Sequence, residues 1–253
     1  MKAADARVLL TGASGGIGRA MAAELQRAGA AVMGVGRGAG RTDMPWVRAD
    51  LTTSEGIAAV RQAAADWQPN VVVQAAGLPG FGALGTVAPA HIAAVLQANL
   101  LAPILLTQAL LPSLMTLPRA QLVFVGSALG RIGLPGFSLY GASKAGLHGF
   151  AEALRRELAG GPVRVQILGP RSTHTAFNGD AVEAYNRATG TAMDRPETVA
   201  AALRALIESE AAERFVGFPE RLAVRLNGVL GAGLDGSFAR HRRHLSVHQG
   251  VTL

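Results

Sequence analysis

The feature that most constrains the fold lies at residues 6–18, where a short apolar run ends in a glycine-rich turn. Residues 6–11 read Ala-Arg-Val-Leu-Leu-Thr, and residues 12–18 read Gly-Ala-Ser-Gly-Gly-Ile-Gly. An amphipathic pattern follows to about residue 29, so the order is strand, glycine turn and helix. Glycines let backbone amides approach a pyrophosphate, and the N-terminus of the following helix favours negative charge. The pattern therefore predicts a dinucleotide-binding unit.

Strand-like and helical patterns alternate along the rest of the chain. This alternation predicts an α/β fold, a three-layer doubly wound parallel sheet. The 253 residues, 49% of them hydrophobic, supply the core of a single domain. We expect this domain at residues 1–218, followed by a basic amphipathic helical extension at 219–253. Strands are predicted at 6–11, 30–36, 46–49, 70–75, 121–127, 162–168 and 214–218.

Composition excludes several function classes. The chain has no cysteine, which excludes disulfides and thiolate metal sites. Its net charge is +7, but the arginines are scattered and no nucleic-acid recognition motif accompanies them, so specific nucleic-acid binding is not expected. A weak attraction to anionic ligands or a membrane surface stays open. No signal-peptide core fits the first residues, and we expect a cytoplasmic protein.

Residues 92–118 carry no charge and are long enough to span a bilayer. The stretch nevertheless contains Gln97, Asn99 and Pro103, and strand-like runs flank it. It is interpreted as a buried helix that is interrupted near Asn99 and Pro103, rather than as a transmembrane span.

The stretch from Ser127 to Lys144 concentrates the residues with chemical potential. Lys144 and Lys2 are the only lysines in a chain that otherwise uses Arg, and Lys144 follows Tyr140 by four residues. Residues at this spacing share one helix face, so a lysine ammonium can lower the pKa of the phenol. Ser127 follows a predicted strand, at the end where open parallel sheets bind ligands. A plain surface lysine beside an aromatic anchor is the alternative.

The end of the second predicted strand bears on cofactor choice. An acid at this position usually holds the ribose 2′-hydroxyl of NAD, but here the strand ends Val35-Gly36-Arg37, and Arg41 follows. A guanidinium suits a 2′-phosphate, so NADP(H) is favoured over NAD(H). A solvated loop arginine is the alternative.

Taken together, these motifs resemble those of the short-chain dehydrogenase/reductase family, over the chain to about residue 218. The resemblance implies a nicotinamide-dependent oxidoreductase on a Rossmann sheet. It rests on Thr11-Gly-x-x-x-Gly-Ile-Gly18, Asp50-Leu51, Ala75-Ala76-Gly77, Asn99, Ser127, Tyr140-x-x-x-Lys144 and Pro170 to Thr175.

The resemblance also implies roles for individual residues. Tyr140 would be the acid/base, Lys144 would lower its pKa and hold the nicotinamide ribose, and Ser127 would bind the substrate carbonyl. Asn99 would hold a water that connects Lys144 to solvent. No metal is implied. The cofactor would contact Gly12, Ser14, Gly16, Ile17, Gly18, Arg37, Asp50, Leu51, Ala76, Gly77, Tyr140, Lys144, Pro170, Thr173 and Thr175.

Three positions depart from the family pattern. Gln74-Ala75 stands where two asparagines are common, so a hydrogen bond in the central sheet would be lost or rearranged. Arg171 replaces a glycine after Pro170, where it could close over the cofactor, meet an anionic substrate, or simply be tolerated in the turn. The usual Asp-Gly-Gly ending is missing. The irregular segment at about 171–194 is expected to be a substrate loop.

The C-terminal extension carries Leu222, Leu226, Val229 and Leu230 at helical spacing, with several arginines. We expect it to pack on the domain or on a partner subunit, while contact with a membrane surface or closure of a substrate channel stays open. Its histidines, His241, His244 and His248, have weak ligand spacing and no acidic partner, so metal binding is not expected.

The favoured function is an NADP-dependent reductase or dehydrogenase that acts on a carbonyl/alcohol pair. Leu134, Phe137 and Phe177 suggest an apolar substrate, acyl or lipid-like. The alternative is a catalytically silent NADP-binding sensor or scaffold. The uncharged helix and the helix after Tyr140 suggest a homodimer or homotetramer.

Overall fold

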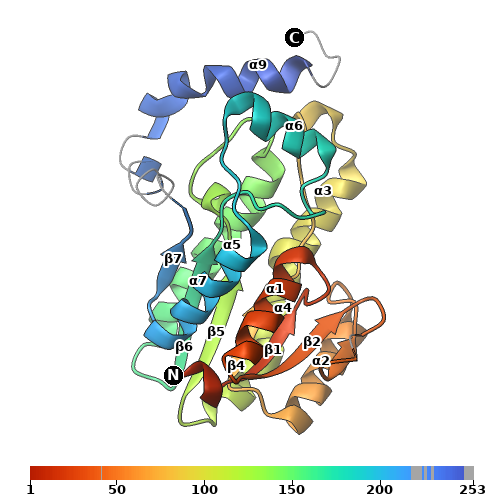
Figure 1. The fold of residues 1–253 in the computed structure, drawn as a ribbon, viewed down its shortest axis with the longest axis vertical. Helices are drawn as coiled ribbons and strands as arrows, with labels where there is room; N and C mark the ends of the chain where they lie inside the picture. The colour runs from red at the N-terminus through yellow and green to blue at the C-terminus, as the bar shows by residue number, and fades with distance from the viewer. Residues whose placement is uncertain (41, 218–223, 225–226, 229–230, 248–253) are drawn as a thin grey trace.

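A parallel seven-stranded sheet forms the centre of the computed structural model, with the strands in the order β3-β2-β1-β4-β5-β6-β7 (Figure 1). The structure describes residues 1–40, 42–217, 224, 227–228 and 231–247. The strands are β1 (Arg7–Thr11), β2 (Ala31–Gly36), β3 (Trp46–Arg48), β4 (Val71–Gln74), β5 (Ala120–Val125), β6 (Val163–Gly169) and β7 (Glu213–Phe215). This confirms the predicted doubly wound fold.

Helices cover both faces of the sheet, as the apolar strands require. One core lies between the sheet and α1 (Gly16–Arg27) with α7 (Pro196–Ser209). The other lies against α2 (Ser54–Trp67), α4 (Ala102–Met115) and α5 (Ser138–Glu157). The remaining elements are η1 (Ala3–Asp5), η2 (Leu84–Thr86), α3 (Pro89–Leu96), η3 (Gln97–Leu101), η4 (Ala128–Gly130), α6 (Asp180–Thr189), η5 (Gly231–Phe238) and α9 (Ala239–Val247).

The strand order reverses between β1 and β4, because β2 lies on one side of β1 and β4 on the other. Leu9 pairs with Met33 on one side and with Val72 on the other, in parallel register. The helices that follow β1 and β4 leave toward opposite faces, which opens a crevice at the carboxyl ends of these strands. The fold therefore offers a ligand site there.

The uncharged helix is continuous from Pro89 to Met115, with a π-helical turn at Gln97–Leu101 in place of a break. Within the described part of the chain it is the one helix apolar and long enough to cross a membrane, and 39% of its most apolar window is buried. It packs on α2 and α5 as part of the domain. Its outer face exposes Leu96, Leu101 and Met115, so the helix is less buried than expected.

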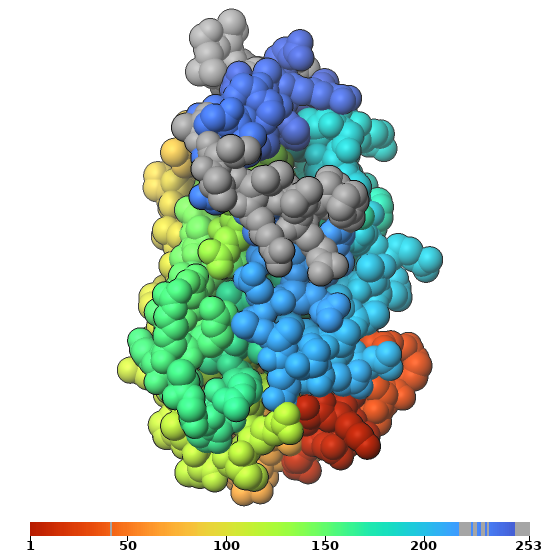
Figure 2. Space-filling view, turned by 90° about the vertical axis from the view of Figure 1, so that its left-hand side faces the viewer, coloured from red at the N-terminus to blue at the C-terminus, as the bar shows by residue number. Residues whose placement is uncertain are grey.

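The C-terminal part packs across one end of the domain. Figure 2 shows α9, in blue, beside α6, and the two helices are in contact. This agrees with packing on the domain for residues 231–247. The four apolar residues Leu222, Leu226, Val229 and Leu230, together with His248, lie outside the described residues.

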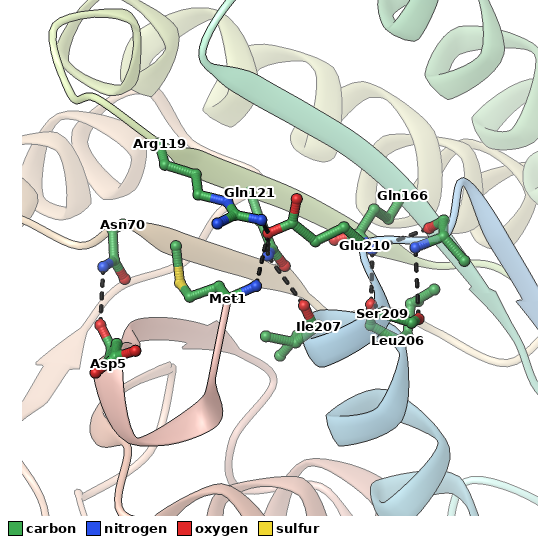
Figure 3. A network of polar contacts seen from close by, with 11 residues as sticks. Met1, Asp5, Asn70, Arg119, Gln121, Gln166, Leu206, Ile207, Ser209 and Glu210 are labelled. Carbon is green, nitrogen blue, oxygen red and sulfur yellow. Dashed lines mark hydrogen bonds and ion pairs between the residues drawn. The ribbon is translucent and has the colours of Figure 1, made fainter.

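A polar network joins the N-terminus of the chain to the end of α7, beside the start of β5 (Figure 3). The Glu210 carboxylate accepts from the Met1 ammonium at 2.7 Å and pairs with the Arg119 guanidinium at 2.5 Å. Gln121 in β5 also donates to Glu210, at 3.1 Å. Burial alone would raise the pKa of Glu210, but the hydrogen bonds from Arg119 and Met1 outweigh it and lower the pKa to about 2.

We expect Glu210→Gln to destabilise the fold at neutral pH by about 1 kcal/mol, because two charge-assisted contacts are lost. The folded pKa is depressed below its ordinary 4.5, so this stabilisation is present above pH 4.5 and is lost as the pH falls toward 2. Urea unfolding at pH 7 and pH 3 measures the difference. Glu208→Gln, at an exposed position of α7, is the matched control. An equal loss at both pH values would contradict the network's role.

Candidate active site

A continuous cavity of about 910 Å³ opens at the carboxyl ends of the strands, at the crevice between β1 and β4. Of the residues assigned from the sequence to catalysis or cofactor binding, all but one line it; the exception is Asn99, which is fully buried. The lining includes Gly12, Ser14, Gly16, Ile17, Gly18, Arg37, Asp50, Leu51, Ala76, Gly77, Ser127, Tyr140, Lys144, Pro170, Thr173 and Thr175.

The glycine turn after β1 forms a floor where side chains have no room. Gly12 has φ +69°, and a Cβ there would lie 2.8 Å from the backbone of Ala76. A Cβ on Gly16 would lie 2.5 Å from Cγ2 of Thr175. The Thr11 hydroxyl accepts from the amides of Ala75 and Ala76 at 3.0 and 3.1 Å, which fixes the turn after β4 beside it. This bare backbone at the start of α1 fits a pyrophosphate.

Arginines and an acid surround the end of the cavity beside β2. Arg48 donates to the carbonyl of Arg37 at 3.1 Å, and Arg19 donates to the carbonyl of Ser14 at 2.8 Å. The Asp50 carboxylate accepts from Thr52, whose hydroxyl and amide lie at 2.7 and 2.9 Å. These bonds, with a weaker contribution from the Arg37 charge, lower the pKa of Asp50. Arg41 lies outside the described residues.

Ser127, Tyr140 and Lys144 meet at the centre of the cavity. Ser127 caps η4, because its hydroxyl accepts from the amide of Leu129 at 3.1 Å. Tyr140 and Lys144 lie one turn apart near the start of α5, as the sequence spacing predicts. The Lys144 ammonium lies 5.7 Å from the centroid of the Tyr140 ring and donates to the Val125 carbonyl at 2.9 Å.

The pKa values at this centre differ from the sequence expectation. Burial raises the pKa of Tyr140 to about 12, although a hydrogen bond with Ser127 lowers it in part. Burial also lowers the pKa of Lys144 to about 8. The expectation that Lys144 brings Tyr140 toward neutrality is therefore wrong for this structure. Burial disfavours the charged form of each group and is the largest cause of both shifts.

Asn99 lies in the π-helical turn, and its amide ties three parts of the site together. Its Oδ1 accepts from the amide of Leu78 at 2.7 Å, and its Nδ2 donates to the carbonyl of Leu78 at 3.0 Å. Nδ2 also reaches the Ser143 hydroxyl at 3.1 Å, which in turn donates to the Tyr140 carbonyl at 2.7 Å. The side chain thus positions the loop after β4 against the start of α5.

The departure at Gln74 is a rearranged bond, one of the two outcomes expected from the sequence. The Gln74 amide donates to the Thr107 hydroxyl at 2.8 Å and to the Pro103 carbonyl at 3.3 Å. The Thr107 hydroxyl in turn donates to the Pro103 carbonyl at 2.7 Å, so the three groups form one buried hydrogen-bonded cluster. The bond links β4 to α4.

The far half of the cavity is largely apolar and aromatic. Phe81 packs on Phe137 and Tyr185, with ring centroids 4.9 and 5.1 Å apart. Phe177 faces Tyr140 at 6.1 Å. The C-terminal segment closes this half, a contribution that sequence patterns did not assign to particular residues. The cavity-lining residues of the C-terminal segment are Asn227, Leu234, Ser237 and Phe238. Arg19, Phe81 and Asn186 also line the cavity and were not predicted from the sequence.

The segment expected to be irregular at 171–194 contains a helix, α6, and Arg171 at its start pairs with Asp194 at its end. This ion pair is none of the three alternatives left open from the sequence, which were closure over the cofactor, contact with an anionic substrate, and a side chain merely tolerated in the turn. α6 buries Val182 and Tyr185 on one face, so its amphipathic pattern was present in the sequence and was missed.

Comparison with known proteins agrees with this geometry. A family model described as short chain dehydrogenase matches residues 6–186. The chain is 30% identical over 194 residues to a 3-oxoacyl-(acyl-carrier-protein) reductase of Pseudomonas aeruginosa, covering 71% of this chain and 78% of that protein. It is 29% identical over 202 residues to dehydrogenase/reductase SDR family member 7B of Rattus norvegicus, covering 71% and 62%. The chain thus spans less than two thirds of the length of that relative.

A solved structure shares the fold over nearly its whole length. It is a short chain dehydrogenase from Burkholderia cenocepacia in complex with NADP, with a TM-score of 0.82 and 23% identity. The match covers 94% of this chain and 99% of that one.

Proposed function

This chain belongs to the short-chain dehydrogenase/reductase family of NAD(P)-dependent oxidoreductases, and we propose that it reduces an apolar carbonyl compound with NADPH, or runs the reverse reaction. The observation that carries the proposal is the meeting of Ser127, Tyr140 and Lys144 in one cavity with the glycine turn.

A bound NADPH would supply the hydride that reduces the carbonyl carbon to an alcohol and would itself be oxidised to NADP⁺. Ser127 holds the carbonyl oxygen through its hydroxyl, which stabilises the developing negative charge. Tyr140 gives that oxygen its phenolic proton, so the alcohol is neutral. Because burial holds the pKa of Tyr140 at about 12, the phenol carries its proton at neutral pH. Lys144 would hold the ribose, and its ammonium, 5.7 Å from the centroid of the Tyr140 ring, would place a positive charge near the phenolate that proton transfer leaves.

NADP(H) is the favoured cofactor because the end of β2 carries Arg37 and no acid, and Ser14 lies beside it. A guanidinium binds a phosphate through paired, charge-assisted hydrogen bonds. Arg37 is exposed, so it is free to turn toward a ligand.

We expect Arg37→Ala to weaken NADPH binding by about 10- to 100-fold, the loss of a charged bidentate contact. NADH lacks the 2′-phosphate, so its Kd should stay within about twofold of the wild-type value. Fluorescence titration with each cofactor measures this. Arg61→Ala removes an exposed arginine from α2 and is the charge-matched control. Equal weakening for both cofactors would contradict the assignment.

The apolar far half of the cavity favours an apolar substrate, acyl or lipid-like. Leu134, Phe137 and Val182 line it together with Leu234 and Phe238, which come from the C-terminal segment. Burying each methylene of such a substrate contributes about 0.8 kcal/mol.

The function is tested by following NADPH oxidation with a panel of ketones and 3-oxoacyl thioesters of increasing chain length. We expect kcat/KM to rise with chain length until the cavity is filled. A protein that binds NADPH tightly and turns over no carbonyl compound would instead be a silent cofactor-binding protein, and the proposal would fail.

We further propose that the exposed leucines of the long helix, Leu96, Leu101 and Leu105, pack against a second copy in a homodimer or homotetramer. They are 37%, 42% and 37% exposed on an uncharged helix. Scattered single apolar residues need no explanation, but a row of them on one helix indicates an interface.

A further inference from the structure

Arg171 and Asp194 form an ion pair at the point where the two ends of the 172–194 segment meet, which we call the neck. This segment walls the substrate half of the cavity. The guanidinium Nη2 and the carboxylate Oδ1 lie 2.7 Å apart, and the side chains are only 16% and 9% exposed. Exposed ion pairs contribute little, but breaking a shielded pair leaves an uncompensated charge. This pair therefore differs from the neighbouring pair of Arg195 and Glu197, whose side chains are 82% and 69% exposed.

The backbone closes the same neck. Thr173 and Asp194 form a parallel bridge. The His174 amide donates to the Asp194 carbonyl at 2.9 Å, and the Asp194 amide donates to the Ser172 carbonyl at 2.8 Å. Both ends of the intervening chain are thereby joined at one point beside Pro170.

Side-chain amides give the segment a fixed internal shape. The Ser172 hydroxyl accepts from Asn186 at 2.7 Å and from Asn178 at 3.2 Å. Asn178 also donates to the Thr173 carbonyl at 2.7 Å. Because Ser172 lies between Arg171 and Thr173, the ion pair and these amide bonds form one connected network.

The neck holds two surfaces of the site. Thr175 packs against the glycine turn, where it occupies the space of a Cβ on Gly16. Phe177 faces the Tyr140 ring, with centroids 6.1 Å apart. On the other side, the Pro170 carbonyl accepts from the Ala128 amide at 2.9 Å, next to Ser127. A shift at the neck would therefore move the cofactor wall and the substrate wall together.

We propose that Arg171 and Asp194 are positioning residues that hold the 172–194 segment in its binding shape before any ligand arrives. The inference rests on the proposed function, and it assigns a purpose to the arginine that replaces the family's glycine. A wall ordered in advance spares a ligand the conformational entropy of ordering it, so the pair should act on binding more than on the hydride-transfer step.

The test compares Arg171→Ala, Asp194→Ala, the double variant and Arg171→Lys with the wild-type protein. Both single variants should raise the NADPH Kd and the substrate KM by about tenfold, with kcat changed less than about threefold. The double variant should be no worse than either single one, since no unpaired charge remains. Arg171→Lys should recover part of the loss. Arg195→Ala, at the exposed neighbouring pair, is the matched control and should change none of these values.

Amide hydrogen exchange measures the local stability of the 172–194 segment in the absence of cofactor and substrate. Amides of residues 172–194 should exchange faster in Arg171→Ala, while those of β5 and β6 stay protected. Lower melting temperatures with unchanged NADPH Kd, or unchanged exchange of the segment, would overturn the proposal and leave the pair a merely stabilising contact. A wild-type protein that binds NADPH but reduces no carbonyl compound would overturn the proposed function alone, because the Kd and exchange comparisons still decide the role of the pair.

Discussion

Replacing Tyr140 with Phe is expected to lower kcat for carbonyl reduction by about 10³-fold, because the positioned proton donor is lost. The aromatic ring remains, so its contact with Phe177 and its packing near Lys144 are kept. NADPH affinity should therefore change less than about threefold. Steady-state kinetics and cofactor titration of the same preparation separate the two effects.

The other tyrosine supplies the control. Tyr185 is fully buried, and its hydroxyl donates to the Pro135 carbonyl at 2.8 Å. Tyr185→Phe should lower stability by about 1 kcal/mol and leave the pH profile of catalysis unchanged. Undiminished turnover by Tyr140→Phe would contradict the assignment of Tyr140 as the acid.

The rates of reduction and of alcohol oxidation should depend on pH through the same residue. Reduction needs the protonated phenol, which the pKa of about 12 maintains across the neutral range. Alcohol oxidation needs the phenolate, so its rate should rise with pH through the range in which the protein stays folded. An oxidation rate that is flat from pH 6 to pH 10 would show that another group takes the proton.

Most of the fold could be predicted from the sequence, because the patterns that indicate its strands, helices and turns are local. Parallel strands buried on both faces appear in the sequence as continuous apolar runs, such as residues 71–73. The run of glycines after the first strand likewise indicates a turn in which backbone atoms lie close together. The cavity then gathers the named residues because a doubly wound sheet brings the carboxyl ends of its strands to one edge. Topology, once predicted, placed residues as distant as Ser14 and Thr173 in one site.

The features of the site that local patterns could not settle depend on contacts distant in sequence. Spacing placed Tyr140 beside Lys144, but the depth of burial that sets both pKa values comes from the whole fold. The partner of Arg171 lies 23 residues away and could not be read from the turn in which Arg171 lies. Gln74 likewise finds Thr107, 33 residues further on.

Replacing Gly18 with Ala is expected to raise the Kd for NADPH by more than about 100-fold. A Cβ at Gly18 would lie 2.1 Å from the carbonyl oxygen of Gly12 and 2.9 Å from Cα of Ala13. Both are backbone atoms, so no side chain can turn aside to make room. Relief requires that the start of α1 move away from the turn after β1, which dismantles the floor that fits the pyrophosphate. The overpacking should also lower the free energy of unfolding by about 1–3 kcal/mol.

Chemical unfolding and NADPH titration of Gly18→Ala measure the two losses separately. Gly149→Ala is the control, because a Cβ at Gly149 in α5 meets nothing within 4 Å. That substitution should stabilise the helix by up to about 1 kcal/mol. If Gly18→Ala bound NADPH as the wild-type protein does, the turn would not hold the pyrophosphate. The cavity would then have to take its dinucleotide in another orientation, and the roles of Arg37 and Tyr140 would have to be assigned again.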